Sequence, residues 1–237
     1  MFRILAVAAA AGAITLGSVG VAAPAFAAPA DTAPKPSNHS SLAEIQAAGA
    51  IQTSNRITAL NAGITKVNST TTLTAPDKST ILGTLNGDLS GMKTLQAKIA
   101  ADTTASVALA DYRSIYTDYR VYAVGLQQSY IAATAGGLTG TAIPKLQSAA
   151  SKISALFAAD PSKATPELQA QLADMQAKTA DAVTKTTGLA AGALAVTPAA
   201  YNANHAVLVD MRAAARDALA DSKAAAQDGQ AILGALT

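Results

Sequence analysis

Residues 111–122 read Asp-Tyr-Arg-Ser-Ile-Tyr-Thr-Asp-Tyr-Arg-Val-Tyr and repeat the triplet Asp-Tyr-Arg after seven residues. The stretch holds four of the six tyrosines in a chain of 237 residues that has no Trp and no Cys. On a helix with about 100° per residue, the stretch and its continuation place a narrow stripe of large side chains on one face. The stripe consists of Tyr112, Ile115, Tyr119, Tyr122, Leu126 and Tyr130. Such a stripe is typical of a helix packed in a coiled-coil-like bundle, so the stretch predicts an all-α fold.

Charged residues flank this stripe on both sides. Asp111 and Asp118 fall on one flank, and Arg113 and Arg120 fall on the other. Because partners on one helix are spaced by three or four residues, these groups are expected to meet adjacent helices instead. Val121, Val124 and Ile131 form a second apolar face, which predicts that the later half of the helix is covered from two sides.

Two interpretations of the tyrosines remain open from sequence. In the first they are core residues, each with its ring buried and its hydroxyl near a polar partner or solvent. In the second they form an aromatic platform for a sugar or apolar ligand, with Arg113 and Arg120 capturing an anionic group. The candidate signature or partner-binding residues are Asp111, Tyr112, Arg113, Asp118, Tyr119, Arg120 and Tyr122.

Helix signals continue on both sides, and no strand pattern is found. Ser41 and Glu44 form a capping box, and Thr-Pro pairs open helices at Thr165 and Thr197. Breaks near 74–76, 102–104, 136–137, 160–166 and 197–198 predict about six helices, the third running without interruption over 105–134 and the sixth over 197–236. We expect an elongated antiparallel bundle over residues 41–237, with a subdivision near 136–140 as an alternative.

The N-terminus has the pattern of a Sec-type secretory signal peptide. A basic start at Arg3 is followed by an uncharged run and by Ala-Phe-Ala, which predicts cleavage after Ala27. An uncleaved transmembrane anchor is the alternative, because the run is long enough to span a bilayer. Residues 28–40 carry three prolines among small and polar residues and predict a disordered leader. The expected location is the cell envelope or the medium, without a stable membrane anchor after cleavage.

The charge balance and the residue types argue against several classes of function. With 17 basic residues, one of them in the signal peptide, against 15 acidic residues, the chain has no electrostatic footprint for nucleic acid. Its two histidines include only His205 in the fold, which is too few for a His-rich metal site. No phosphate-binding loop, nucleophile elbow or metalloprotease motif is present. We therefore expect no cofactor, no metal and no catalytic residue.

The tyrosine stretch also carries a family resemblance. Tyr119-Arg120-Val121-Tyr122, followed by an apolar stretch, resembles the central signature of secreted all-helical actinobacterial proteins of uncharacterised function. Thr197-Pro198 and the spaced residues Asn204, Leu208, Arg212, Arg216 and Asp221 resemble their later long helix. In place of the proline that such proteins carry after the signature stand Leu126-Gln127-Gln128, which favours a continuous helix here. The resemblance implies a fold and a location but no mechanism.

The leading functional hypothesis is an exported helical-bundle protein that binds a protein or envelope partner without catalysis. A membrane-active or pore-forming protein is the first alternative, with candidate segments at residues 188–196 and 121–135. An enzyme that uses Asp111 and Asp118 in a cleft is the second alternative. The ligand and the oligomeric state do not follow from the sequence.

Overall fold

The computed structural model describes residues 35–71 and 73–236, and this part of the chain is helical without strands. Six long helical runs are joined by two short helices, which confirms the predicted all-α class. The long runs are α1 (Leu42–Ser69), α2 (Ala75–Ala101), α3 (Ala105–Ser114) with the π-helical turn η1 (Ile115–Tyr119), α4 (Gly125–Gly137) with η2 (Leu138–Ala142) and α5 (Ile143–Ala159), α6 (Pro166–Thr186) and α9 (Val207–Leu236). A 3₁₀ turn, η3 (Pro161–Lys163), and the short helices α7 (Leu189–Leu194) and α8 (Pro198–Ala203) lie between them.

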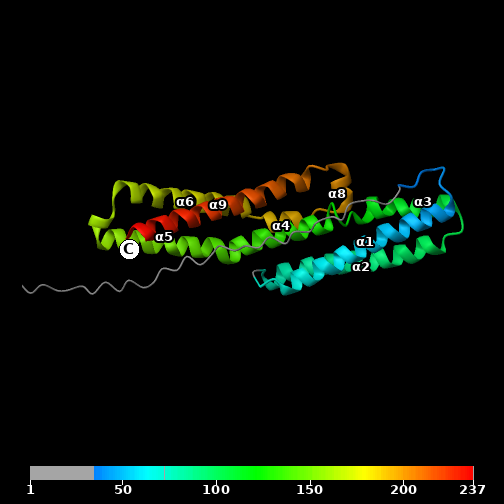
Figure 1. The fold of residues 1–237 in the computed structure, drawn as a ribbon, viewed down its shortest axis with the longest axis horizontal. Coiled ribbons are helices and arrows are strands. Elements are labelled where there is room, and N and C mark those ends of the chain that lie inside the picture. The colour runs from blue at the N-terminus through cyan, green and yellow to red at the C-terminus, as the bar shows by residue number, and fades with distance from the viewer. Residues whose placement is uncertain (1–34, 72, 237) are drawn as a thin grey trace, which may run out of the picture.

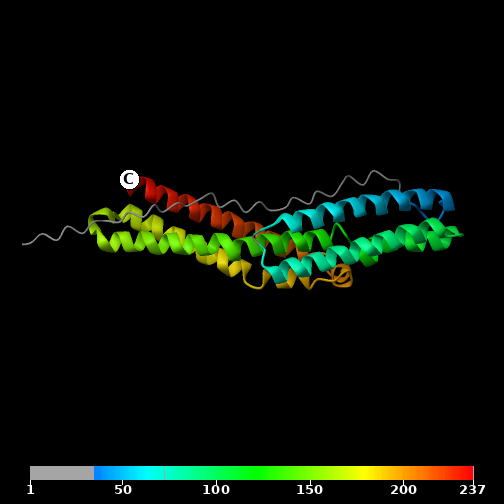
Figure 2. The same ribbon diagram turned by 90° about the horizontal axis from the view of Figure 1, so that it is seen from below.

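The molecule is an elongated antiparallel bundle (Figures 1 and 2). Helices α1, α2 and α3 form one end, and α5, α6 and α9 form the other end (Figure 1). Helix α4 lies between the two ends and contacts α2 and α1 on one side and α7 and α9 on the other. The buried apolar side chains form a cluster at each end and further clusters around α4 and η2.

Local sequence signals explain where the helices begin. Ser41 accepts a hydrogen bond from the Glu44 amide, while its own amide donates to the Glu44 carboxylate at 2.7 Å, and this reciprocal bond holds the pKa of Glu44 below its usual value. Thr74, Thr165 and Thr197 cap α2, α6 and α8, each by accepting one backbone amide hydrogen bond and each with a proline in the first turn. These predicted starts are confirmed.

The prediction of one continuous helix over 105–134 is wrong. Helix α3 loosens into the π-helical turn η1, and Arg120 then adopts a left-handed backbone with φ of 49° and ψ of 35°. Residues 121–124 form turns before α4 begins at Gly125. The stripe therefore ends at Tyr119: Tyr122 lies in the turns, and Leu126 and Tyr130 lie on α4. The chain interrupts the helix without the proline that would have signalled an interruption.

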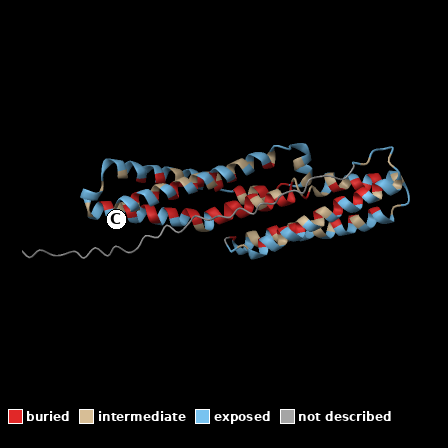
Figure 3. Ribbon diagram, viewed as in Figure 1, coloured by how far each residue is buried: buried red, intermediate tan, exposed pale blue. Residues whose placement is uncertain are grey.

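The predicted break at Gly136–Gly137 is also wrong, because α4, η2 and α5 form one continuous helical run. Both glycines are buried, and a Cβ on Gly136 would approach the Leu73 side chain to 3.1 Å. The two residues permit close packing of this helix rather than ending it. Every residue from 131 to 138 is buried, as the red band along α4 shows (Figure 3), so the prediction of a helix covered from two sides is confirmed.

The later helices differ from their predicted bounds. The helix that begins at Thr165 ends at Thr186, before the predicted break at 197–198, because Gly188 turns the chain with φ of 70°. The sixth predicted helix is interrupted after the six residues of α8 and resumes at Val207. Asn204 causes this interruption, since its side chain accepts the Ala206 amide hydrogen bond at 3.0 Å in a local turn.

The predictions for the N-terminus fall largely outside the described residues. The signal peptide, its cleavage after Ala27 and residues 28–34 of the leader all belong to the part that is not described. Residues 35–40 are described and form a turn in which the Ser40 amide donates to the Ser37 carbonyl at 3.1 Å. Among the helices of the described ranges, none has the length and hydropathy required for a membrane crossing.

Candidate functional site

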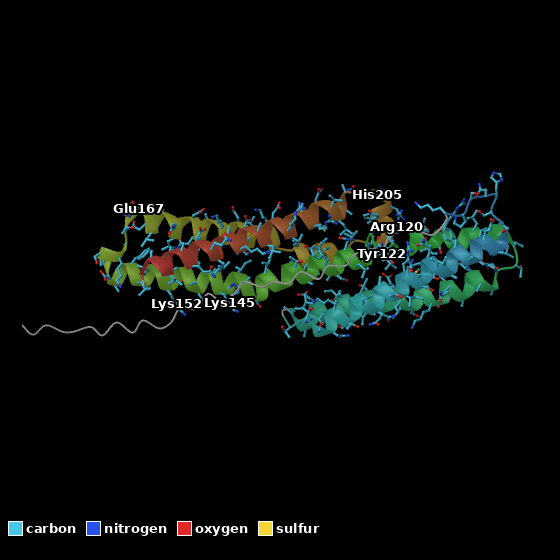
Figure 4. All side chains as sticks on the ribbon, viewed as in Figure 1. Arg120, Tyr122, Lys145, Lys152, Glu167 and His205 are labelled. Atoms are coloured by element: carbon cyan, nitrogen blue, oxygen red, sulfur yellow. The ribbon has the colours of Figure 1, made fainter. Side chains whose placement is uncertain are left out.

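The seven residues predicted as a signature lie at the break between α3 and α4. We call the region made of residues 111–122, Arg56 of α1 and Tyr201–Asn202 of α8 the tyrosine corner. Tyr112 and Asp111 are buried, Tyr119, Arg120 and Tyr122 are partly buried, and Arg113 and Asp118 are exposed. The corner lies near the middle of the molecule, where Arg120 and Tyr122 are labelled in Figure 4.

Arg56 is the centre of the buried part of the corner. Its side chain is 5% exposed, and its guanidinium carbon lies 4.7 Å from the Tyr116 ring centroid and 4.8 Å from that of Tyr122. Arg56 Nη1 donates to the Gln52 backbone carbonyl at 3.0 Å and also to the Gln52 side-chain oxygen. The two rings, which carry negative charge density on their faces, thus stabilise a buried cation that has no carboxylate partner among the described residues.

The tyrosine side chains of the corner make different contacts. The Tyr112 and Tyr116 hydroxyl oxygens are 3.1 Å apart and share a hydrogen bond. Tyr119 instead packs its ring into the surface of α2 at Gly91, where a Cβ would lie 2.1 Å from the Tyr119 Cε1 atom. A side chain at this position would overlap the ring unless the ring moved. The interpretation of the tyrosines as packing residues is thereby supported for Tyr112 and Tyr119.

Both arginines of the sequence repeat bind neutral side chains. Arg113 Nη2 donates to Asn38 Oδ1 at 2.7 Å, so the end of the leader is attached to α3. Arg120 Nε donates to Asn202 Oδ1 at 2.8 Å, and Asn202 Nδ2 donates to the Thr117 carbonyl at 2.9 Å. The Arg120 guanidinium also lies 5.6 Å from the Tyr201 ring centroid. These contacts hold α8 against η1.

The two aspartates of the repeat have separate roles. Asp111 accepts a 2.8 Å hydrogen bond from Lys98 of α2, an interaction that raises the pKa of Lys98. Burial, and then the neighbouring Asp111 carboxylate, raises the pKa of Asp102. Asp118 is exposed and accepts a hydrogen bond from Thr117 at 2.8 Å. The expectation that the repeat contacts adjacent helices is thus confirmed for Asp111 and Arg120.

One acid near the corner was not predicted from the sequence. Asp88 of α2 lies against the start of α4, since a Cβ on Gly125 would come within 2.6 Å of Asp88 Oδ2. Burial raises the pKa of Asp88 to about 6. A carboxylate with a raised pKa is one feature of functional sites, although packing produces the same effect.

The sequence reasoning missed Arg56, Gln52, Tyr116, Tyr201 and Asn202. A usable signal existed for the first two, because Gln52 and Arg56 are spaced by four residues and fall on the same helix face as Leu60. A polar pair in phase with an apolar face predicts a buried polar contact. Nothing local marks Asn202, whose partners lie more than eighty positions away along the chain.

A groove of about 490 Å³ lies elsewhere, between α5 and α6. Its walls carry neutral side chains, with Gln147, Ser151 and Ser154 on α5 and Gln176 and Thr179 on α6. The three hydroxyl groups donate to carbonyls of their own helices. No residue predicted from the sequence lines this groove.

Within residues 35–71 and 73–236, no three His, Cys, Asp or Glu side chains are grouped as a metal site would require. Comparisons of the chain with protein-family models, with curated proteins and with solved structures gave no match.

Proposed function

We propose that the chain is an exported, non-catalytic binding protein of the cell envelope or medium, and that the tyrosine corner is its binding surface. The observation that supports this proposal is the composition of the corner's surface. Tyr116, Tyr119, Tyr122 and Arg120 are all partly exposed at one interruption of the bundle. Tyrosine and arginine are the side chains most enriched at the energetic centres of binding surfaces.

The backbone at Arg120 supports the same choice. A left-handed conformation costs a residue other than glycine about 1 kcal/mol, and such outliers are concentrated at ligand-binding and switch regions. The π-helical turn η1, which precedes Arg120, is also common at functional sites. The interruption thus directs an arginine and several rings to one surface at a cost in backbone energy.

A ligand screen by thermal shift tests this proposal. Compounds that raise the melting temperature of the wild-type chain are tested again on Arg120→Gln and on Arg216→Gln, which changes an exposed arginine of α9 outside the corner. We expect compounds that stabilise the wild type and Arg216→Gln but not Arg120→Gln. If every stabilising compound acts equally on all three proteins, the corner is not the binding surface.

Export is tested separately by expressing the chain in a Gram-positive host and sequencing the N-terminus of the protein in the medium. A mature protein that begins at Ala28 is the expected result. Retention of the whole chain in the membrane fraction would support the uncleaved anchor instead.

The membrane-active alternative is not proposed, because residues 131–135 of its candidate segment are buried inside the bundle.

A further inference from the structure

We infer that the tyrosine corner binds an oxyanion, a carboxylate or phosphate group, through the guanidinium of Arg120. The inference rests on the proposed function and specifies its ligand class. It begins from the charge balance of the corner. Arg56, Arg113 and Arg120 are bonded to Gln52, Asn38 and Asn202, and none of these partners carries a charge.

Within the described residues, ion pairs are formed by Lys98, Lys178, Lys185 and Arg216, and by none of the three arginines of the corner. The acids of the corner do not balance its arginines, because Asp111 is paired with Lys98 and only Asp118, which forms no ion pair among the described residues, stands against three guanidinium groups. The corner therefore has an excess of positive charge that an anion would compensate.

Arg56, in the interior, also has no anionic partner among the described residues. Its Nε atom is buried and has no hydrogen-bond acceptor among the described residues. A buried guanidinium without a carboxylate is costly, and the Tyr116 and Tyr122 rings compensate only part of that cost. Its field acts through a medium of low polarity, so it adds to the attraction of an anion at the nearby surface.

Arg120 offers the accessible donors. It is partly buried and uses Nε for Asn202, and no bond of its two terminal nitrogens is found in the described residues. A guanidinium held in this way keeps one edge, formed by Nη1 and Nη2, for two parallel bonds to the oxygens of a carboxylate or phosphate. The Tyr201 ring beneath the guanidinium and the Asn202 carboxamide fix its orientation before a ligand arrives.

His205 supplies a further donor that contacts the same ring as Arg120. Its imidazole ring is exposed and meets the Tyr201 ring edge-on, with 4.9 Å between the ring centroids. Arg120 and His205 thus contact the same tyrosine, and both are labelled at the α8 end of the corner in Figure 4. A guanidinium and an imidazole N–H around one phenol ring form a site with donors and no acidic group.

Titration of the ¹⁵N-labelled full chain with inorganic phosphate and with citrate tests the inference, with sodium chloride at matched ionic strength as the control. We expect saturable shifts at Arg120, Tyr201 and Asn202, and a roughly tenfold loss of affinity in Arg120→Gln, as for loss of one charge-assisted contact. Arg216→Gln, which removes an exposed arginine of α9 outside the corner, is the matched control and keeps the wild-type affinity. A response to phosphate alone or to citrate alone identifies which oxyanion is preferred.

His205→Gln provides a second test that does not depend on the fold, because this side chain is exposed. We expect it to weaken the same titration while the melting temperature stays unchanged. Equal shifts with chloride, or an affinity for phosphate and citrate that survives both substitutions, would overturn the oxyanion inference. Neutral compounds that bind at the corner would then preserve the proposed function, whereas the absence of any ligand would remove both.

Discussion

Two glycines on α2 have opposite surroundings, although they lie on the same helix. The Tyr119 ring occupies the space that a Cβ on Gly91 would take, whereas a Cβ on Gly83 would meet no atom within 4 Å. We expect Gly91→Ala to lower the free energy of unfolding by about 1–3 kcal/mol, because the methyl group forces the ring to move. Gly83→Ala should raise it by about 0.5–1 kcal/mol, since alanine is the better helix former. Urea unfolding of both variants measures the difference, and equal effects would mean that Tyr119 is not packed at Gly91.

Asp88 makes stability depend on pH. Because burial raises its folded pKa to about 6 from 3.8, the folded state favours the protonated acid. The contribution of protonated Asp88 to the free energy of unfolding is therefore complete below pH 3.8 and is lost as the pH rises through 6. We expect Asp88→Asn to stabilise the chain by about 1 kcal/mol at pH 8, after reduction for partial solvent exposure, and to have little effect at pH 4.

Thermal unfolding at pH 4, 6 and 8 measures this dependence. Asp118→Asn, which changes an exposed acid in the same region, is the control for the loss of one surface charge. A constant difference between wild type and Asp88→Asn would show that the raised pKa of Asp88 does not affect stability.

At the scale of the elements, Gln128 attaches α7 to α4. Its Nε2 donates to the Ala193 carbonyl at 2.9 Å and to the Val196 carbonyl, both in buried surroundings. We expect Gln128→Ala to cost about 2–3 kcal/mol, because two buried acceptors lose their donor. Hydrogen exchange of the α7 amides should accelerate in this variant. Gln127→Ala, which removes the adjacent and less buried amide, should leave that exchange unchanged.

Helix starts could be predicted from the sequence, whereas the interruptions could not. Ser41, Thr165 and Thr197 satisfy backbone amides within four residues, so their effect is local and readable. The break at Arg120 depends instead on Arg56, Tyr201 and Asn202, which are distant in the sequence. The role of Gly136 could not be predicted for the same reason. This glycine allows close packing against Leu73, which is distant in the sequence, and does not end a helix. The site residues on 111–122 were found, but their partners were not.

For the whole molecule, the continuous run of α4, η2 and α5 sets the length. At about 1.5 Å per residue this run alone spans roughly 50 Å, and α1, α2 and α3 extend beyond it (Figure 1). We expect small-angle X-ray scattering to give a radius of gyration above about 20 Å, against roughly 16–17 Å for a compact domain of similar size. A compact value would mean that the two ends fold back on each other in solution.

The deep burial of α4, in which only Gln127 and Tyr130 are partly exposed, also has a consequence for the order of folding. No charged residue lies between Arg120 and Lys145. The helices packed against α4 are α1 and α2, which precede it in the chain, and α7 and α9, which follow it. A chain that emerges with its N-terminus first therefore has to wait for α9 before this uncharged helix is covered. During that interval α4 is an exposed apolar surface, so a chaperone that keeps the chain from aggregating would be needed longest at its middle.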